Sequence, residues 1–477
     1  HWLKSSYDCL LVDALRLMIP PTLRGQRARE KVERTVAVAL GRDGSELLAS
    51  LLDKSGKKRA PKQYEVLELL LSTGLAMSVS DVSACIPNAG PAIRALIERG
   101  YLVESGHVTF RTPMADAVTL DRAVTPTGAQ LAAVKAVSDA MAVKKTETFL
   151  LHGVTGSGKT EVYMRCIRAC LDNGKSAILL VPEISLTPQT VALFRARFGD
   201  EIAVLHSKLS DGERYDEWRR IRLGRARVAV GARSAIFAPM PDVGLIVVDE
   251  EHETSYQSET SPRYHAADVA AKRAALASAP LLLGSATPQL LSYYRATTGR
   301  YQLLRLPNRV QKRPLPTVEI VDMREEFLSG NNGIFSARLT GLLHDCFAKS
   351  QQAMLFLNRR GYSTFVSCRA CGAVVECENC DLSMTYHKLE NRMECHFCGN
   401  GKPVPCVCPS CKKPFIKYFG IGTEQAEEQA KKLFPGVNAL RMDTDTVRGK
   451  NDTQTILAAF ASGEAQPRVS VTPMRSA

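Results

Sequence analysis

The sequence predicts an α/β protein of several domains, and three observations support this fold class. From about residue 120 to residue 300, apolar strands alternate with helices, which is typical of a parallel sheet covered on both faces. A similar alternation starts again after residue 306 and resumes over residues 419–460. Four closely spaced C-x-x-C pairs interrupt this second stretch. We therefore expect two α/β lobes, the second carrying a metal-binding insertion.

Length and composition narrow the class of protein further. A chain of 477 residues predicts three or four domains, since one domain usually takes about 100 to 200 residues. No apolar run approaches the roughly 18 residues that a membrane span needs. The net charge of +13 suits a polyanionic partner such as nucleic acid, although many basic proteins bind none. The chain starts at His1 without a basic-then-apolar leader, and we expect it to begin inside a larger protein.

A small helical domain is expected before the first lobe. Three segments have helical spacing or capping residues, at 61–74, 78–87 and 91–104, and residues 106–112 alternate like a strand. Three helices followed by a hairpin is the order of a winged helix. Such a domain places the third helix, with Arg94 and Arg99, near DNA. The alternative is a winged helix that serves as a protein spacer.

A phosphate-binding loop follows the first strand of the α/β region. Phe149–Leu151 end an apolar strand, and the next residues match the pattern G-x-x-x-x-G-K-T. The glycines let several backbone N–H groups face one anion, the lysine adds a charge for the β and γ phosphates, and the threonine hydroxyl suits Mg²⁺. A glycine-rich turn that binds nothing is the alternative. The predicted ATP-binding residues are Gly153, Val154, Thr155, Gly156, Ser157, Gly158, Lys159 and Thr160.

Two carboxylates complete the predicted ATP site. The apolar strand in VGLIVVDEEH delivers Asp249 and Glu250 to its carboxyl end, where an open α/β sheet binds ligands. Asp249 is suited to hold Mg²⁺ through water, and Glu250 to orient and deprotonate the attacking water. Taken alone, such a pair is often only a solvated turn. Upstream, Gln130 is a candidate to bind adenine through its amide, although a lone glutamine is usually just surface.

Three further polar segments lie where strands should end. They are Pro182–Gln189, Gly231–Ala235 and Gly284–Thr287, and their backbone N–H and hydroxyl groups suit a nucleic-acid backbone or a sensor of the nucleotide. As isolated turns they would mean little.

The cysteine block predicts two zinc ions. Eight thiolates in four knuckles suit two tetrahedral Cys₄ sites, and the gap between Cys380 and Cys395 suits a hairpin that closes one of them. The outer pairs then close the other site around it. Cys406 is spare, and His387 and His396 are expected as hydrogen-bonding neighbours. A redox role for the C-x-x-C pairs is the alternative. The expected ligand sets are Cys368, Cys371, Cys408 and Cys411 for one zinc, and Cys377, Cys380, Cys395 and Cys398 for the other.

These motifs resemble those of the primosomal protein N-prime (PriA) family, the bacterial replication-restart helicases of superfamily 2. The resemblance runs from about residue 60 to residue 460. Several ATPase families share the phosphate loop and the DEEH box, whereas the eight-cysteine insertion after LNRRGY is much more specific. The segments that carry it are HGVTGSGKTEVY, VPEISLTPQT, GARSAIF, DEEHETSYQSETSPRYHAADVA, LGSATP, LFLNRRGY and GIGTEQAEE.

The resemblance implies an ATP-driven, 3′-to-5′ DNA helicase with ATP, Mg²⁺ and two Zn²⁺ as cofactors. It implies branched and single-stranded DNA, primosome proteins and single-stranded DNA-binding protein as partners, no membrane, and a bacterial cytoplasmic, nucleoid-associated location. In the family, Thr254–His265 corresponds to a loop that couples DNA to ATP hydrolysis. The implied coupling or DNA-contacting residues are Arg233, His252, Tyr256, Arg263, Tyr264, His265, Ser285 and Thr287.

The same resemblance assigns the domains. Both lobes are then RecA-like helicase lobes, and the zinc module carries its two ions in the nested pairing. The expected domains are 1–26, a remnant of an N-terminal DNA-binding domain and linker; 27–115, the winged helix; 116–305, helicase lobe 1; 306–364 with 419–460, an incomplete lobe 2; 365–418, the zinc module; and 461–477, an atypical tail.

Two departures from the family pattern bear on activity. We expect the family's N-terminal domain to be almost wholly missing before His1. After Phe460 a strand with a G-T-Q-M type motif and a later arginine motif are expected in the family, but this chain reads ASGEAQPRVSVTPMRSA. Without an arginine finger, phosphoryl transfer falls about 10³- to 10⁵-fold, so we expect ATP binding with poor hydrolysis. The rival hypotheses are a DNA-binding and assembly module without motor activity, and an RNA helicase.

Overall fold

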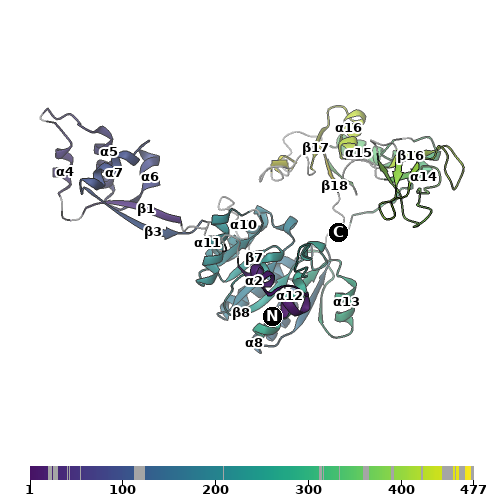
Figure 1. Ribbon diagram of the computed structural model, residues 1–477, viewed down its shortest axis with the longest axis horizontal. Coiled ribbons are helices and arrows are strands. Elements are labelled where there is room, and N and C mark those ends of the chain that lie inside the picture. The colour runs from purple at the N-terminus through teal and green to yellow at the C-terminus, as the bar shows by residue number, and fades with distance from the viewer. Residues whose placement is uncertain are drawn as a thin grey trace. The chain divides into compact units, whose positions relative to one another are not determined.

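The computed structural model of the chain forms two compact units, His1–Pro314 and Leu315–Ala477. We describe each unit by itself (Figure 1). Residues outside the following ranges are not described. The described residues are 1–19, 24, 31–39, 41, 43–53, 55–111, 124–207, 209–310, 314, 316–331, 333–357, 365–387, 392–419, 423–442, 455–456, 458–460 and 468–473.

A parallel sheet forms the centre of the first unit, as the alternating pattern predicts. All its described neighbours pair in parallel. In spatial order the strands are β10 (Gln302–Leu306), β4 (Thr148–Gly153), β9 (Leu281–Ser285), β8 (Val243–Val248), β5 (Ser176–Leu180), β7 (Val228–Gly231) and β6 (Ile202–Leu205).

Helices cover both faces of this sheet. Because side chains alternate along a strand, Phe149 and Leu151 face one core whereas Leu150 faces the other. The first core contains residues of α8 (Gly128–Ala142), α9 (Lys159–Asp172) and α10 (Pro188–Phe198). The second contains residues of α11 (Asp211–Arg222), α12 (Ala266–Ala277) and α13 (Leu290–Thr297). Burial on both faces explains why central strands such as β5 and β8 read as nearly unbroken apolar runs.

The chain's first residues pack on this lobe. Helices α1 (Trp2–Ser6) and α2 (Leu11–Met18) bury Leu3 and Ala14 in the second core. The backbone N–H of His265 donates to the Tyr7 hydroxyl at 3.4 Å. The buried apolar residues of α1 and α2 join the second core beside α12, and the assignment of this segment to the tail of another domain stays a prediction.

The small domain has the three predicted helices, but its strand pairing differs from the prediction. Helices α5 (Pro61–Thr73), α6 (Val79–Cys85) and α7 (Gly90–Glu98) share one core with α4 (Gly44–Ser50). We expected a hairpin after the third helix. Among the described residues, β3 (Leu102–Thr109) pairs along its whole length with the upstream strand β1 (Lys31–Val38), which also pairs with β2 (Met77–Ser78), and residues 112–123 after it lie outside the described ranges. The winged-helix assignment stays a prediction.

The second unit contains a parallel sheet in the spatial order β11 (Gln352–Leu357), β18 (Arg468–Pro473) and β17 (Asn438–Arg441). Helices α15 (Ala337–Ala348) and α16 (Thr423–Leu433) share its core, and α14 (Met323–Leu328) precedes them. After Phe460, where we expected an atypical tail, the described residues include the strand β18. The alternating β-branched residues of RVSVTP favour a strand, and β18 lies between the other two. Part of LFLNRRGY and of GIGTEQAEE lies outside the described residues.

Five short antiparallel strands form the cysteine module. Their order is β15 (Gly401–Pro403), β14 (Arg392–Glu394), β13 (Thr385–His387), β12 (Phe365–Cys368) and β16 (Ile416–Phe419). In the sequence, the module is inserted between β11 and α16 of the second unit. Among the described residues of the whole chain, no helix is both long and apolar enough to cross a membrane.

Candidate nucleotide site and metal centres

The phosphate loop has the backbone that its glycines predict. Gly156 and Gly158 have φ values of +78° and +79°, a region that side chains disfavour. The loop leaves β4 at Gly153, and α9 starts at Lys159, so the first N–H groups of this helix face the loop. The Lys159 ammonium donates to the carbonyl of Gly153 at 3.2 Å.

The segment after β10 supports this loop, and the sequence analysis did not identify it. The N–H of Val154 donates to the carbonyl of Leu306 at 3.2 Å, and the N–H of Val310 donates to that of Gly156 at 2.9 Å. The loop is therefore held from the edge strand of the sheet as well as from its own helix.

Gln130 is buried beneath the phosphate loop. Its side chain forms a capping box with Thr127 at the start of α8, and its amide nitrogen donates to the carbonyl of Ser157 at 2.9 Å. A side chain at Gly158 would meet that nitrogen at 2.3 Å. Gln130 thus supports the loop in this structure, and its contact with adenine stays a prediction.

Asp249 and Glu250 lie at the carboxyl end of β8, next to the phosphate loop. The Lys159 Nζ lies 3.4 Å from Oε1 of Glu250. Burial raises the pKa of Asp249 to about 6, with a smaller increase from the charge of Glu250. A hydrogen bond from Tyr163 and the charge of Lys159 oppose this increase. The two predicted carboxylates and the predicted lysine therefore share one site.

Tyr163 is a residue of this site that the sequence analysis missed. It lies on α9, one turn after Lys159, and its hydroxyl donates to Oδ1 of Asp249 at 2.8 Å. Tyr163 ends the segment HGVTGSGKTEVY, but a tyrosine in this position is equally well explained by burial on the apolar face of the helix. Only the fold shows that its hydroxyl reaches the end of β8.

A polar network joins the DEEH segment to the end of β9. Nδ1 of His252 and the Ser285 hydroxyl are 2.8 Å apart, and Nε2 of His252 lies 3.5 Å from the Thr287 hydroxyl. Glu251, which the sequence analysis did not select, is buried and accepts hydrogen bonds from the Gln289 N–H at 2.8 Å and the Ser292 hydroxyl at 3.0 Å. Glu251 thereby links the segment after β8 to the turn before α13 and to the first turns of that helix.

The predicted coupling loop contains both internal and exposed residues. Tyr256 is buried and donates to the main-chain carbonyl of Asp249 at 2.7 Å. Tyr264 is buried too, and the Arg233 guanidinium lies 5.9 Å from its ring centre. His265 caps α12 by accepting the N–H of Ala267 at 3.3 Å. Arg263 is exposed, so within this set it is the residue best placed for a phosphate.

The residues present fit a nucleotide with magnesium. The Ser157 hydroxyl is buried and has no hydrogen-bond partner in the described part of the chain, as expected of a group that a phosphate oxygen satisfies. The Lys159 side chain is only 10% exposed, and its nearest anionic group is Glu250. A bound triphosphate supplies the negative charge that this loop, ammonium and helix end favour.

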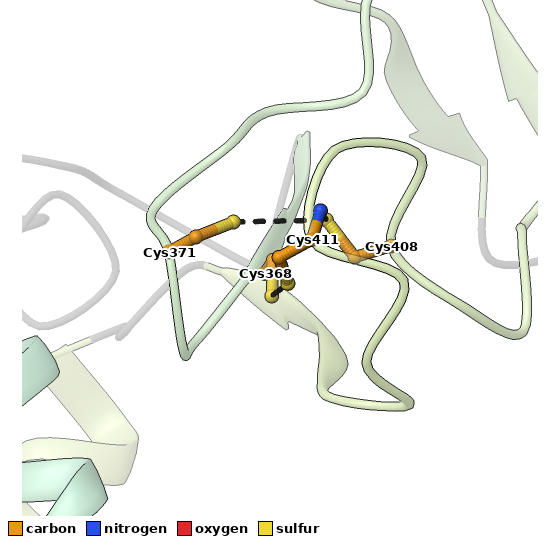
Figure 2. A group of neighbouring side chains, drawn as sticks. All are labelled: Cys368, Cys371, Cys408 and Cys411. Carbon is orange, nitrogen blue, oxygen red and sulfur yellow. Dashed lines mark hydrogen bonds between the residues drawn. The ribbon is translucent and has the colours of Figure 1, made fainter.

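The eight paired cysteines form two clusters with the predicted membership. In each cluster the four sulfur atoms lie within 4.8 Å of one another. Figure 2 shows the first, in which Cys368 and Cys371 meet Cys408 and Cys411. Four thiolates about 2.3 Å from one zinc ion lie about 3.8 Å apart at tetrahedral angles. The observed Sγ–Sγ separations are 3.6 Å for Cys368–Cys411, 3.7 Å for Cys371–Cys408 and 3.6 Å for Cys377–Cys398.

The four knuckles share one backbone turn. A residue with positive φ follows the second cysteine of each pair, and its N–H donates to the carbonyl of the first cysteine at 2.8 to 3.0 Å. Glycine fills this position in two of the knuckles. The four turn residues are Gly372, Asp381, Gly399 and Lys412.

The other candidates near the clusters have the expected places. Nε2 of His387 and Nε2 of His396 are 3.0 Å apart, so the two rings are each other's neighbours. Neither belongs to a four-sulfur group. Cys406 is exposed and lies outside both groups. Zinc itself stays a prediction, and these closed sets leave no open coordination position.

Sequence comparison identifies the family. The chain is 47% identical over 411 residues to the replication restart protein PriA of Bacillus subtilis, covering 86% of this chain. The chain belongs to the PriA family. It is also 36% identical over 477 residues to PriA of Chlamydia pneumoniae, covering 97% of this chain. The chain spans 51% of the length of the first relative and 62% of the second.

Two family models agree with the fold. One, described as DEAD/DEAH box helicase, matches residues 127–294, which contain the phosphate loop and DEEH box. The other, the PriA DNA helicase Cys-rich region domain, matches residues 377–403, which contain the inner PriA-type cysteine cluster. Among solved structures, one of RecG bound to a three-way DNA junction aligns with this chain at 16% identity and a TM-score of 0.40. The alignment covers 74% of this chain and 37% of the RecG chain. That similarity is too low to support an argument.

Proposed function

We propose that this chain is the ATP-binding part of a DNA helicase that acts in replication restart. The observation that carries the proposal is the convergence of Lys159, Asp249 and Glu250 at one edge of the first unit's sheet. The phosphate loop holds the triphosphate, Asp249 holds magnesium through water, and Glu250 orients the attacking water. The family's direction of movement, 3′-to-5′, is part of the proposal.

DNA is the proposed second substrate, in single-stranded and branched form. Support comes from the exposed Arg263 on the loop whose Tyr256 contacts Asp249, and from the net charge of +13. Residues 27–115 are proposed as a winged-helix DNA-binding domain. Primosome proteins and single-stranded DNA-binding protein are the proposed partners, and an association with the nucleoid follows from the DNA substrate.

The other domain assignments belong to the same proposal. Residues 116–305 are helicase lobe 1, residues 306–364 and 419–460 contribute to lobe 2, and residues 365–418 are a zinc module. The strand β18 extends this second lobe beyond residue 460. Each four-cysteine group is proposed to bind one structural Zn²⁺ because its thiolates fill all four tetrahedral positions.

A DNA-stimulated phosphate-release assay tests the helicase proposal. We expect single-stranded DNA to increase the chain's low ATP turnover and Lys159→Ala to abolish it. Tight binding to forked DNA with no ATP binding would instead indicate a DNA-binding assembly module. Equal stimulation by single-stranded RNA and DNA would contradict the choice of DNA as substrate.

A further inference from the structure

Tyr163 is a buried tyrosine whose hydroxyl lies inside the proposed nucleotide site. It is 1% exposed and donates to Oδ1 of Asp249 at 2.8 Å. Burial and the nearby acidic groups raise its pKa well above 10, so the hydroxyl stays a neutral donor over the ordinary pH range. The hydroxyl has a single hydrogen to donate, and it donates that hydrogen to Oδ1 of Asp249. One of the two carboxylate oxygens is therefore already engaged.

Gly284 in the neighbouring strand makes room for this hydroxyl. A Cβ atom at this position would lie 1.7 Å from the Tyr163 oxygen and 2.7 Å from its Cζ atom. Gly284 lies in β9, between the strand that leads to the phosphate loop and the strand that ends at Asp249. Gly284 has ordinary strand geometry, so its backbone does not require glycine. The structural reason for glycine here is the space that the Tyr163 side chain occupies.

Asp249 is held at a second point from the predicted coupling loop. The Tyr256 hydroxyl donates to its main-chain carbonyl at 2.7 Å. The N–H of Asp249 donates to the carbonyl of Leu180 in β5 at 2.9 Å. With the backbone fixed by these two bonds, rotation of the carboxylate is the remaining freedom. The hydrogen bond from Tyr163 restricts it, together with one from the backbone of Glu250.

We propose that Tyr163 is a positioning residue that orients the Asp249 carboxylate for magnesium, in a space that Gly284 keeps open. Its hydroxyl occupies Oδ1 and leaves Oδ2 for the hydrated ion. This inference rests on the proposed nucleotide function. A preset carboxylate binds the ion without first losing rotational freedom, which lowers the magnesium concentration that nucleotide binding requires.

Magnesium titrations of nucleotide binding test the role of Tyr163. A fluorescent ATP analogue is bound to the chain at increasing Mg²⁺, and the half-saturating Mg²⁺ concentration is measured. We expect Tyr163→Phe to raise this concentration about tenfold, since a hydrogen bond to a charged group is lost. Binding of the analogue without Mg²⁺ should change less than about twofold, because the phosphate loop is intact. Tyr301→Phe is the matched control, since its hydroxyl accepts from Arg295 at 2.9 Å, away from Asp249.

A double variant separates positioning from a general loss of packing. Gly284→Ala should also raise the Mg²⁺ requirement because it displaces the tyrosine ring. If both changes act through the Tyr163 hydroxyl, Gly284→Ala with Tyr163→Phe should require no more Mg²⁺ than Gly284→Ala alone. Effects that multiply, or a Tyr163→Phe variant that matches Tyr301→Phe, would overturn the inference. Nucleotide binding by the unaltered chain that shows no response to Mg²⁺ would contradict the proposed function itself.

Discussion

The ammonium of Lys159 lies 3.4 Å from Oε1 of Glu250, across the space between the phosphate loop and the end of β8. The two residues come from elements that are far apart in the sequence, and both belong to the proposed nucleotide site. Lys159 is suited to the phosphates, and Glu250 is then free to act on water. Each half of this contact therefore has a different expected effect when it is changed.

Glu250→Gln should separate binding from hydrolysis. The amide keeps the size of the side chain but cannot accept a proton, so ATP turnover should fall about 10²- to 10⁴-fold. Binding of Mg-ATP should stay within about threefold of the unaltered chain, because the loop and Asp249 remain. Phosphate release and equilibrium nucleotide binding measure the two quantities. Equal losses in both would show that Glu250 contributes mainly to binding.

Magnesium binding should weaken below about pH 6. The pKa of Asp249 is raised to about 6 by burial, so its carboxylate takes up a proton as the pH falls through that value. Magnesium needs the ionised form, and its affinity should fall about tenfold per unit below the pKa. In the chain without ligand, the effect of this group on folding stability changes with pH in the opposite direction to its effect on magnesium affinity. The folded state holds the proton more tightly than the unfolded state, so this group favours folding as the pH falls from about 6 to about 4.

The magnesium titration repeated between pH 5 and pH 8 measures this effect. Asp249→Asn is the control, because it should weaken the affinity throughout and leave only the pH dependence of the nucleotide's own phosphate. A Mg²⁺ affinity that is constant from pH 7 to pH 5 would contradict the assignment of Asp249.

Each cysteine cluster should lose its own zinc ion independently. We expect two Zn²⁺ per chain by elemental analysis, and one after Cys371→Ser or after Cys377→Ser, because each removes a ligand from a different group. Cys406→Ser is the matched control and should retain both ions, since Cys406 lies outside the groups. Loss of an ion from Cys406→Ser would show that the predicted ligand sets are wrong.

Arg111 should stabilise the junction between β3 and the first lobe. Its guanidinium donates to the carboxylate of Asp216 at 2.8 Å, and that aspartate side chain is fully buried. Removing the side chain takes away the ion-pair partner of this buried carboxylate, and the N–H of residue 111, at 3.0 Å, remains as a donor to it. Because Arg111 is itself one-third exposed, we expect Arg111→Ala to lower the free energy of unfolding by about 2 kcal/mol.

Urea denaturation measures this change, with Arg34→Ala as the control. Arg34 and Glu104 form a pair 3.3 Å apart whose side chains are 65% and 34% exposed, so its loss should cost below about 1 kcal/mol. Equal effects of the two variants would argue against a special role for the buried Asp216.

The fold could be predicted where one rule of local chemistry decided the structure. Strands buried on both faces gave uniform apolar runs, and the Gly156 and Gly158 positions require left-handed backbone. Knuckle spacing alone was enough for the grouping of the cysteines. The phosphate loop and the end of β8 were likewise predictable from the residues that follow an apolar strand.

Other features of the fold depend on pairing between segments that are distant in the sequence, and local sequence patterns do not predict such pairing. The pairing of β3 with β1 is one, and the insertion of β18 between β11 and β17 is another. In the site, Gln130 was selected for adenine, but the fold places its amide against Ser157. Tyr163 was overlooked because its partner Asp249 lies 86 positions away.

Calorimetric titration of ATP with magnesium into the purified chain tests the central claim most directly. The account predicts one saturable site per chain, lost in Lys159→Ala and retained in Tyr301→Phe. Absence of binding to the unaltered chain at millimolar ATP and magnesium, or equal binding by Lys159→Ala, would contradict it.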